Sequence, residues 1–286
     1  MSATIIDGKK VSLAIREKLK KETETFVKET GIVPGLAVVL VGNDAASAVY
    51  VRNKHRACNE IGFYSEVHEL PEDTKEDDLL TLLARLNDDP KIHGILVQLP
   101  LPKQIDADKV IRAIKPEKDV DAFHPENVGR IMLGNYRYLP CTPAGVMELL
   151  DAYEINPSGK DCVVVGRSNI VGKPQALLLL ERNATVTVCH SRTSDLASHT
   201  KRADIIVVAV GKPRFLKRDM VKPGSVVIDV GINRLPDGKL CGDADFEPIS
   251  KIASAITPVP GGVGPMTITM LMQNTLTAAK ECVKNA

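Results

Sequence analysis

A phenol and an amine stand one helical turn apart in one stretch of the chain. Ser47, Tyr50 and Lys54 have the i, i+3, i+4 spacing that places side chains on one face of a helix, and Cys58 and Ile61 continue this stripe. A lysine that is partly desolvated in a cleft has a lowered pKa and can transfer protons near neutral pH. The stripe also fits an exposed lysine on an ordinary amphipathic helix, and taken alone it favours that interpretation.

Other polar side chains follow apolar, strand-like segments. Gln98 comes directly after one such segment, and open α/β sheets bind ligands at these strand ends. Asp119 and Asp121 could accept hydrogen bonds from a polar ring or cap the next helix, and alone they favour capping. We expect His124 and His190 to be structural, because nothing places a second base beside either.

A glycine loop joins a predicted strand to a predicted helix at Gly166-Arg167-Ser168-Asn169-Ile170-Val171-Gly172. Such loops hold the pyrophosphate of a dinucleotide in Rossmann units. Ser168 replaces the second glycine of the usual fingerprint, and Gly172 comes one residue late. The loop is therefore a weak signal alone, and the order strand, loop, helix strengthens it.

The end of the next predicted strand bears on the choice of cofactor. It reads Cys189-His190-Ser191-Arg192-Thr193, without the carboxylate that binds the ribose hydroxyls of NAD. Ser191 and Arg192, together with Arg167, favour a 2′-phosphate and hence NADP. Arg192 fits a solvated surface charge equally well.

The run from Pro258 to Thr267 contains three glycines and three prolines in ten residues. The glycines allow positive φ and close approach of the backbone to a ligand, and the prolines stiffen the loop. This composition suits a loop that binds a flat polar ring or a phosphate. A rigid turn before a C-terminal helix explains it about equally well.

Composition excludes several classes of protein. The chain has no Trp and a net charge of +1, which argues against a nucleic-acid partner. Its six cysteines form no C-x-x-C pair and no metal-ligand spacing, so we expect buried free thiols in a reducing compartment and no metal site. The N-terminus lacks signal-peptide features and no apolar run reaches the length of a membrane span, so we expect a cytoplasmic protein.

Helical and strand patterns alternate along the 286 residues, which predicts an α/β fold with mostly parallel sheets. The predicted boundary between two domains falls near residue 140. Helices are expected at 9–30, 45–61, 74–86, 142–153, 171–182 and 266–283. Strands are expected at 36–41, 65–70, 94–97, 161–165, 185–189, 205–209 and 226–230.

Taken in order, these segments resemble the bifunctional methylenetetrahydrofolate dehydrogenase/methenyltetrahydrofolate cyclohydrolase family over nearly the whole chain. The matching motifs are Ser47–Lys54, Gly94–Pro100, Lys118–Asp121, Pro140–Pro143, Gly166–Gly172, Cys189–Ser191 and Pro258–Thr267. The resemblance implies two α/β domains with a cleft between them and a Rossmann-type parallel sheet in the second. It implies a folate-binding catalytic domain at 1–140, completed by the helix 266–286, and an NADP-binding domain at 141–265. It also implies a homodimer.

The resemblance further implies two successive reactions on a folate substrate. NADP⁺ takes a hydride from 5,10-methylenetetrahydrofolate, and water then opens the methenyl product to 10-formyltetrahydrofolate. By this resemblance Lys54 handles the proton of the hydrolytic step, Gln98 positions Lys54, Tyr50 lies against the folate and Asp121 binds the pterin. The remaining residues implied in substrate or cofactor binding are Val97, Leu99, Pro260, Gly261 and Gly262 for folate, and Gly166, Arg167, Ser168, Ser191 and Ile232 for NADP.

One position departs from the family pattern, which usually has glycine after the second aspartate where this chain has Ala122. If that position needs a positive φ, alanine is strained there. Two alternative functions fit parts of the sequence. A cyclohydrolase without dehydrogenase activity is disfavoured by the intact cofactor loop. A non-enzymatic nucleotide-binding regulator is disfavoured by the combination of Lys54, Gln98 and Asp121.

Overall fold

A computed structural model describes residues 3–284, and the chain divides into two compact units. Unit 1 comprises Met1–Leu13 and Thr142–Thr267, and unit 2 comprises Ala14–Cys141 and Ile268–Ala286. The long helices α1 (Gly8–Thr30) and α10 (Val263–Lys284) each contribute residues to both units.

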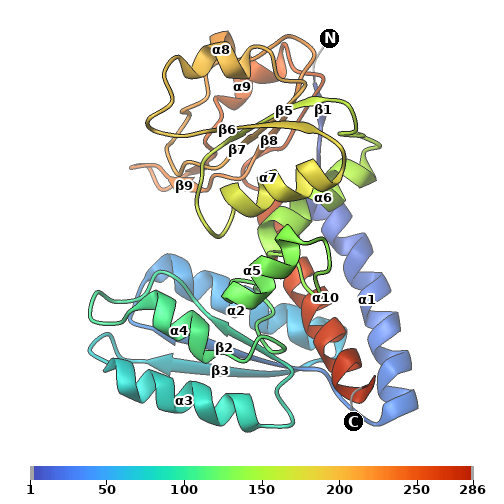
Figure 1. The fold of residues 1–286 in the computed structure, drawn as a ribbon, viewed down its shortest axis with the longest axis vertical. Coiled ribbons are helices and arrows are strands. Elements are labelled where there is room, and N and C mark those ends of the chain that lie inside the picture. The colour runs from blue at the N-terminus through green and yellow to red at the C-terminus, as the bar shows by residue number, and fades with distance from the viewer. Residues whose placement is uncertain (1–2, 285–286) are drawn as a thin grey trace. The chain divides into compact units, whose positions relative to one another are not determined.

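Unit 2 contains a three-stranded parallel sheet in the order β3-β2-β4 (Figure 1). Its strands and helices, besides α1 and α10, are β2 (Gly35–Val41), β3 (Tyr64–Leu70), β4 (Gly94–Val97), α2 (Ala45–Ile61), α3 (Glu76–Asp88), α4 (Ala107–Ala113) and α5 (Pro125–Met132). Alternate residues of β2, including Ala37 and Val39, pack with Leu79 and Leu83 of α3 and with Val110 of α4. This apolar cluster fixes α3 and α4 on one face of the sheet.

Helix α2 contacts β2 and β3. It begins after Asp44, whose carboxylate accepts a hydrogen bond from the Ser47 backbone N–H at 2.7 Å. It ends at Gly62, which has a left-handed φ of 85°. These two signals are those that commonly begin and end helices, and they give the predicted bounds of this helix.

Unit 1 contains a six-stranded parallel sheet in the order β1-β11-β8-β7-β5-β6. The strands are β1 (Thr4–Ile5), β5 (Asp161–Val165), β6 (Thr185–Cys189), β7 (Ile205–Val208), β8 (Val226–Asp229) and β11 (Ala255–Ile256). β7 is a fully buried apolar run, and β8 is fully buried with three apolar residues before Asp229, as expected for central strands covered on both faces. The predicted Rossmann-type parallel sheet is confirmed.

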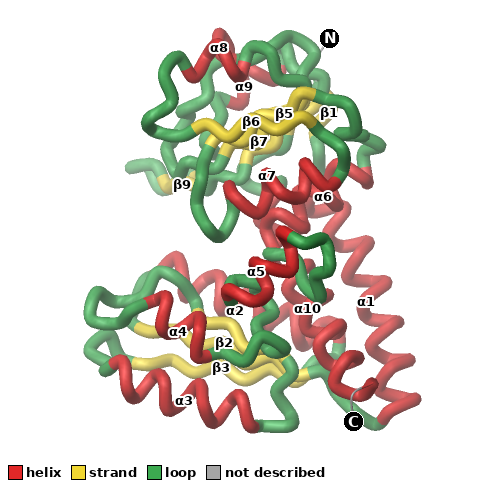
Figure 2. The backbone as a smooth tube through the Cα atoms, in the orientation of Figure 1, coloured by secondary structure: helices red, strands yellow, loops and turns green. Residues whose placement is uncertain are grey.

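Helices flank the sheet of unit 1 (Figure 2). Its shorter elements are α6 (Cys141–Ala152), α7 (Gly172–Glu181), α8 (Leu196–Thr200), the 3₁₀ helix η1 (Arg218–Met220), α9 (Phe246–Ser250) and a hairpin of β9 (Asn233–Arg234) with β10 (Leu240–Cys241). Ile206 and Val208 of β7 pack with Ile249 of α9 and Leu196 of α8 in one buried cluster.

The division into units differs from the boundaries expected from the sequence at the N-terminal segment. Residues 1–13 group with 142–267 because Thr4 and Ile5 pair with Ala255 and Ile256. The pairing joins residues 251 positions apart in the chain, and a strand of two residues has no visible sequence pattern.

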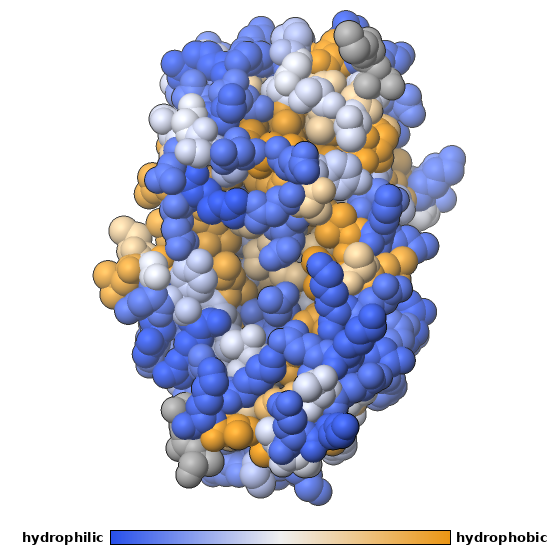
Figure 3. Space-filling view, turned by 90° about the vertical axis from the view of Figure 1, so that its right-hand side faces the viewer, coloured by the Kyte–Doolittle hydropathy of each residue, from blue (hydrophilic) through white to orange (hydrophobic). Residues whose placement is uncertain are grey.

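Polar side chains cover much of the face shown in Figure 3. Within residues 3–284, no helix combines the length and apolar character needed to cross a membrane.

Candidate active site

Lys54 lies in the middle of α2 and is buried, with only 7% of its surface exposed. The interpretation as an exposed lysine on an ordinary amphipathic helix is therefore wrong. Tyr50, one turn earlier, is half-buried, and burial raises the pKa of its phenol. The helix thus brings an amine and a phenol out of bulk water; the stripe predicted that they share a face but alone favoured an exposed lysine.

Gln98 fixes the Lys54 amine. Its backbone N–H donates to the Val39 carbonyl at 2.8 Å, and its side-chain Nε2 donates to the Leu99 carbonyl at 2.8 Å. These two contacts leave Oε1 facing Lys54, whose Nζ donates to it at 2.9 Å. Gln98 is neutral, so it orients the amine without stabilising its charged form as strongly as a carboxylate would.

Burial shifts the pKa values of Lys54 and Asp121 in opposite directions. Desolvation lowers the pKa of Lys54, and the nearby Asp121 carboxylate partly opposes this effect. Desolvation raises the pKa of Asp121, with Lys54 and a hydrogen bond from the Cys141 thiol opposing it. The lowered pKa of Lys54 favours the neutral amine, which is the form that can accept a proton.

The two aspartates of the loop 119–123, Asp119 and Asp121, make different contacts. Asp119 Oδ2 accepts hydrogen bonds from the His124 backbone N–H at 2.7 Å and from Asn127 Nδ2 at 2.8 Å. Asp119 therefore holds the residues around the start of α5, but the N-cap of this helix is His124, whose Nδ1 accepts from the Glu126 backbone N–H at 3.1 Å. Asp121 takes no part in these contacts. Ala122 has a φ of 58°, so the alanine occupies a left-handed position that favours glycine.

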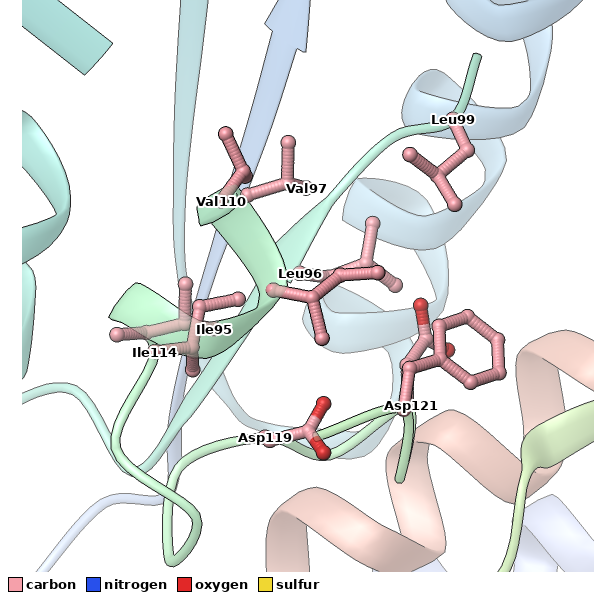
Figure 4. Close-up of a pocket in the computed structure, with 10 residues that line it drawn as sticks. Ile95, Leu96, Val97, Leu99, Val110, Ile114, Asp119 and Asp121 are labelled. Carbon is pink, nitrogen blue, oxygen red and sulfur yellow. The ribbon is translucent and has the colours of Figure 1, made fainter. Parts of the chain in front are cut away.

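A small pocket of unit 2 lies beside Asp121, whose side chain stands on the same loop as Asp119 (Figure 4). Most of its lining is apolar. The lining residues are Ile95, Leu96, Val97, Leu99, Val110, Ile111, Ile114, Asp119, Asp121 and Phe123. Three of the residues implied in folate binding, Val97, Leu99 and Asp121, are thus brought together.

Asn274 supports this part of unit 2, and the sequence prediction missed it. From α10 its Nδ2 donates to the carbonyls of Val120 at 2.8 Å and Leu139 at 2.9 Å. These contacts hold the backbone beside Asp121 and Cys141. A polar residue inside the apolar run 268–276 was the available signal, because buried amides are retained where they have partners.

The glycine loop of unit 1 follows β5, at the place where the strand order reverses. β6 lies on one side of β5 and β7 on the other, and open α/β sheets bind ligands at such a switch point. A side chain on Gly172 would approach the Gly166 carbonyl oxygen within 2.3 Å. Ser168 Oγ accepts from the backbone N–H groups of Val171 at 3.1 Å and Gly172 at 3.3 Å. The serine thus closes the loop in the place of the usual second glycine.

Two further strand ends carry the other residues implied in cofactor binding. After β6, His190 Nδ1 accepts from the Arg192 backbone N–H at 3.1 Å, so His190 shapes the turn. Ser191 and Arg192 are exposed. Arg167 is also exposed. Ile232 follows β8 and is 42% exposed.

The 258–262 loop of unit 1 is fixed to the start of α1. Gly261 has the positive φ expected of this run, 103°, and its carbonyl accepts from the Lys9 backbone N–H at 3.0 Å. Pro260 is exposed and Gly262 is buried.

Within residues 3–284, no group of three or more His, Cys, Asp or Glu side chains has the arrangement of a metal site. Four of the six cysteines are buried, among them Cys58 and Cys141.

Both parts of the chain match models of one protein family. Residues 6–121 match the tetrahydrofolate dehydrogenase/cyclohydrolase catalytic domain, and residues 140–283 match the NAD(P)-binding domain of the same family. The bifunctional protein FolD of Acetivibrio thermocellus is 62% identical over 280 residues, which cover 98% of either chain.

Two solved structures share the fold over nearly the full length. The bifunctional FolD methylenetetrahydrofolate dehydrogenase/cyclohydrolase of Campylobacter jejuni has a TM-score of 0.96 and 53% identity, covering 98% of this chain and 100% of that one. The Trypanosoma brucei FolD enzyme, solved with NADP and an inhibitor, has a TM-score of 0.96 and 41% identity, covering 99% of each chain. The chain therefore belongs to the tetrahydrofolate dehydrogenase/cyclohydrolase family, and it carries both the catalytic and the NAD(P)-binding domain of that family.

Proposed function

We propose that this chain is a bifunctional enzyme that oxidises 5,10-methylenetetrahydrofolate with NADP⁺ and hydrolyses the methenyl product to 10-formyltetrahydrofolate. The observation that carries the proposal is the buried Lys54 amine held 2.9 Å from Gln98 Oε1. Family membership supports both reactions, and the relatives with the bifunctional name match across the whole chain.

The hydrolytic step requires a group that takes a proton from water as it attacks the methenyl carbon. The Lys54 amine is suited to this role because burial lowers its pKa and so raises the share of the neutral base. Gln98 holds the amine in place, and Asp121 accepts hydrogen bonds from the N–H groups of the pterin. Tyr50, four residues before Lys54 on the same helix face, lies against the folate ring.

Further residues are proposed for folate binding. In unit 2, Val97 and Leu99 provide apolar contact in this proposal, an assignment that rests on the family resemblance. In unit 1, Pro260, Gly261 and Gly262 belong to a stiff loop, in which Pro260 is exposed, Gly261 is partly exposed and Gly262 is buried. Their assignment rests on the family resemblance, together with the positive φ and fixed position of Gly261.

The oxidative step depends on positioning, because NADP⁺ when bound accepts the hydride of the methylene carbon and so supplies the chemistry. The Gly166–Gly172 loop suits a pyrophosphate for two reasons. Its glycines leave the backbone without side chains, and it lies at the switch point of the sheet, where open α/β sheets bind ligands. Arg167 and Ser191 bind the 2′-phosphate in this proposal and Ile232 contacts the cofactor, and the exposure of all three side chains supports these roles. The NADP complex of the Trypanosoma brucei relative supports this choice.

We also propose that the enzyme is a cytoplasmic homodimer, as the family resemblance implies. Sedimentation of the purified protein tests the dimer, and fractionation of cells that express the chain tests the compartment.

A coupled absorbance assay tests both activities. Purified protein is given methylenetetrahydrofolate with NADP⁺ or NAD⁺, and NADPH or NADH formation is followed. Methenyltetrahydrofolate hydrolysis is followed separately without any nicotinamide. The proposal expects both activities and a preference for NADP⁺. Hydrolysis without any dehydrogenase activity would instead show a monofunctional cyclohydrolase.

A further inference from the structure

Two buried carboxylates tie together loops of unit 1 that follow different strands. Asp243 is fully buried. Its Oδ2 accepts from the backbone N–H groups of Val210 at 2.6 Å and Gly211 at 2.9 Å. Its Oδ1 accepts from the Lys212 backbone N–H at 2.9 Å and from Asn233 Nδ2 at 2.9 Å. One side chain thus holds the loop after β7 and a residue after β8.

Asp229, the last residue of β8, holds Asp243 in place and is only 3% exposed. Its Oδ1 accepts from the backbone N–H groups of Gly231 and Asp243, both at 2.9 Å. Its Oδ2 accepts from the Ala244 backbone N–H at 2.7 Å. The segment 243–244 is therefore fastened to the end of β8.

The two carboxylates also approach each other's glycine neighbours. A Cβ on Gly231 would lie 2.2 Å from Asp243 Cγ, and a Cβ on Gly242 would lie 1.9 Å from Asp229 Oδ2. These distances are too short for any side chain. Only glycine therefore fits at these two positions. Each carboxylate packs directly against a glycine backbone, which restricts the positions that the two carboxylates can take.

The loops held in this way stand at the ligand-binding edge of the sheet. β7 is the neighbour of β5, and β8 is the neighbour of β7. The loop after β7 is also close to the glycine loop, since a Cβ on Gly166 would lie 2.3 Å from the Ala209 carbonyl oxygen. Ile232, implied in cofactor contact, lies between Gly231 and Asn233, which Asp229 and Asp243 hold.

We propose that Asp243, fastened by Asp229, is a positioning residue for NADP: it fixes the loops after β7 and β8 in the shape that receives the cofactor and presents Ile232. This inference rests on the proposed cofactor site. A carboxylate is required, because each oxygen accepts two hydrogen bonds. An asparagine offers a single acceptor oxygen, and either orientation of its amide places N–H groups against two donors.

The test compares Asp243→Asn with Asp204→Asn. Asp204 is also a carboxylate of unit 1, accepting from the Asp161 backbone N–H at 3.0 Å and from Lys222 at 2.7 Å. It precedes β7 and so stands at the opposite edge of the sheet.

NADP binding is titrated by fluorescence, and methenyltetrahydrofolate hydrolysis is measured without cofactor. Asp243→Asn is expected to raise the Kd and KM for NADP at least about tenfold. Hydrolysis is expected to stay within about twofold of wild type in both variants, and Asp204→Asn to leave NADP binding unchanged.

Several outcomes would overturn the inference. An unchanged Kd for NADP in Asp243→Asn, or a parallel loss of hydrolysis, would show that the two carboxylates serve folding alone. If Asp243→Asn does not fold, Asn233→Ala replaces it, because this variant removes only one donor. It should raise the Kd for NADP about threefold, and an unchanged Kd would count against the inference. Wild-type protein that binds no NADP would instead contradict the proposed cofactor site itself.

Discussion

The Lys54 site of unit 2 and the glycine loop of unit 1 are built in different ways. Lys54 is 7% exposed and its amine is held by a side chain, Gln98, at 2.9 Å. Arg167 and Ser168 are exposed, and their loop is shaped by hydrogen bonds from backbone N–H groups to Ser168 Oγ and by the absence of side chains at Gly166 and Gly172.

This difference follows from what each region supplies to the reaction. In the proposed mechanism unit 2 supplies a proton acceptor, so its key group must be desolvated and its pKa lowered. Unit 1 holds a cofactor that carries its own chemistry, so it needs shape and a few charges rather than shifted pKa values. Changes in the two regions should therefore have separable effects.

The largest effect is expected from Lys54→Met. Loss of a general acid–base group should lower the rate of methenyltetrahydrofolate hydrolysis by about 10²–10⁴-fold. Folate binding should remain, because the aliphatic part of the side chain is kept. Stopped-flow absorbance measures the hydrolysis, and Lys20→Met, at an exposed position of α1, is the matched control. Hydrolysis at the wild-type rate would exclude Lys54 as the proton acceptor.

Asp121→Ala should weaken folate binding and leave NADP binding nearly unchanged. Each charge-assisted hydrogen bond to the pterin contributes about 1.5–3 kcal/mol, so affinity should fall roughly 10–150-fold. Titrations with each ligand measure the two effects, with Asp88→Ala as a control at an exposed carboxylate of the same unit. Equal losses for both ligands would make Asp121 a structural residue.

Arg167→Ala should have the opposite selectivity. Removing one contact to the 2′-phosphate should raise the KM for NADP⁺ by about 10–150-fold and change the KM for NAD⁺ little. The contact is remote from the nicotinamide, so kcat should change less than KM. Steady-state kinetics with both cofactors provide the test. If both cofactors suffer alike, Arg167 only shapes the loop.

A dependence of the hydrolysis rate on pH is expected from the same lysine. Burial lowers the pKa of Lys54 below its ordinary 10.5, so the neutral amine becomes the major form at a lower pH than for an exposed lysine. The hydrolysis rate should rise up to about tenfold per pH unit below that pKa and level off above it. Rates measured across the pH range, with Lys54→Arg for comparison, test this, because a guanidinium stays charged. A wild-type profile that matches the Lys54→Arg profile would contradict it.

Local signals explain which parts of the fold the sequence predicted. Asp44 and Gly62 mark the ends of α2, and the predicted bounds of this helix are confirmed. β1 was missed because its two residues are defined only by pairing with β11, far away in the chain. Long-range pairing of this kind leaves no periodic pattern to read.

The site shows the same division between local and long-range information. The helical stripe predicted that Tyr50 and Lys54 share a face, but only the fold shows that Lys54 is buried against Gln98. Asp229 and Asp243 were not singled out, because each resembles an ordinary turn aspartate in sequence. Their role depends on donors from three separate segments.

The central claim is that hydrolysis depends on unit 2 and that cofactor affinity depends on unit 1. The most direct test measures both properties on the same two variants. Methenyltetrahydrofolate hydrolysis is measured without cofactor, and the Kd for NADP is measured by titration. Lys54→Met should lose hydrolysis with the Kd for NADP within about twofold of wild type, and Arg167→Ala should raise that Kd with hydrolysis within about twofold. A variant that impairs both functions together, with its fold intact by circular dichroism, would contradict the account.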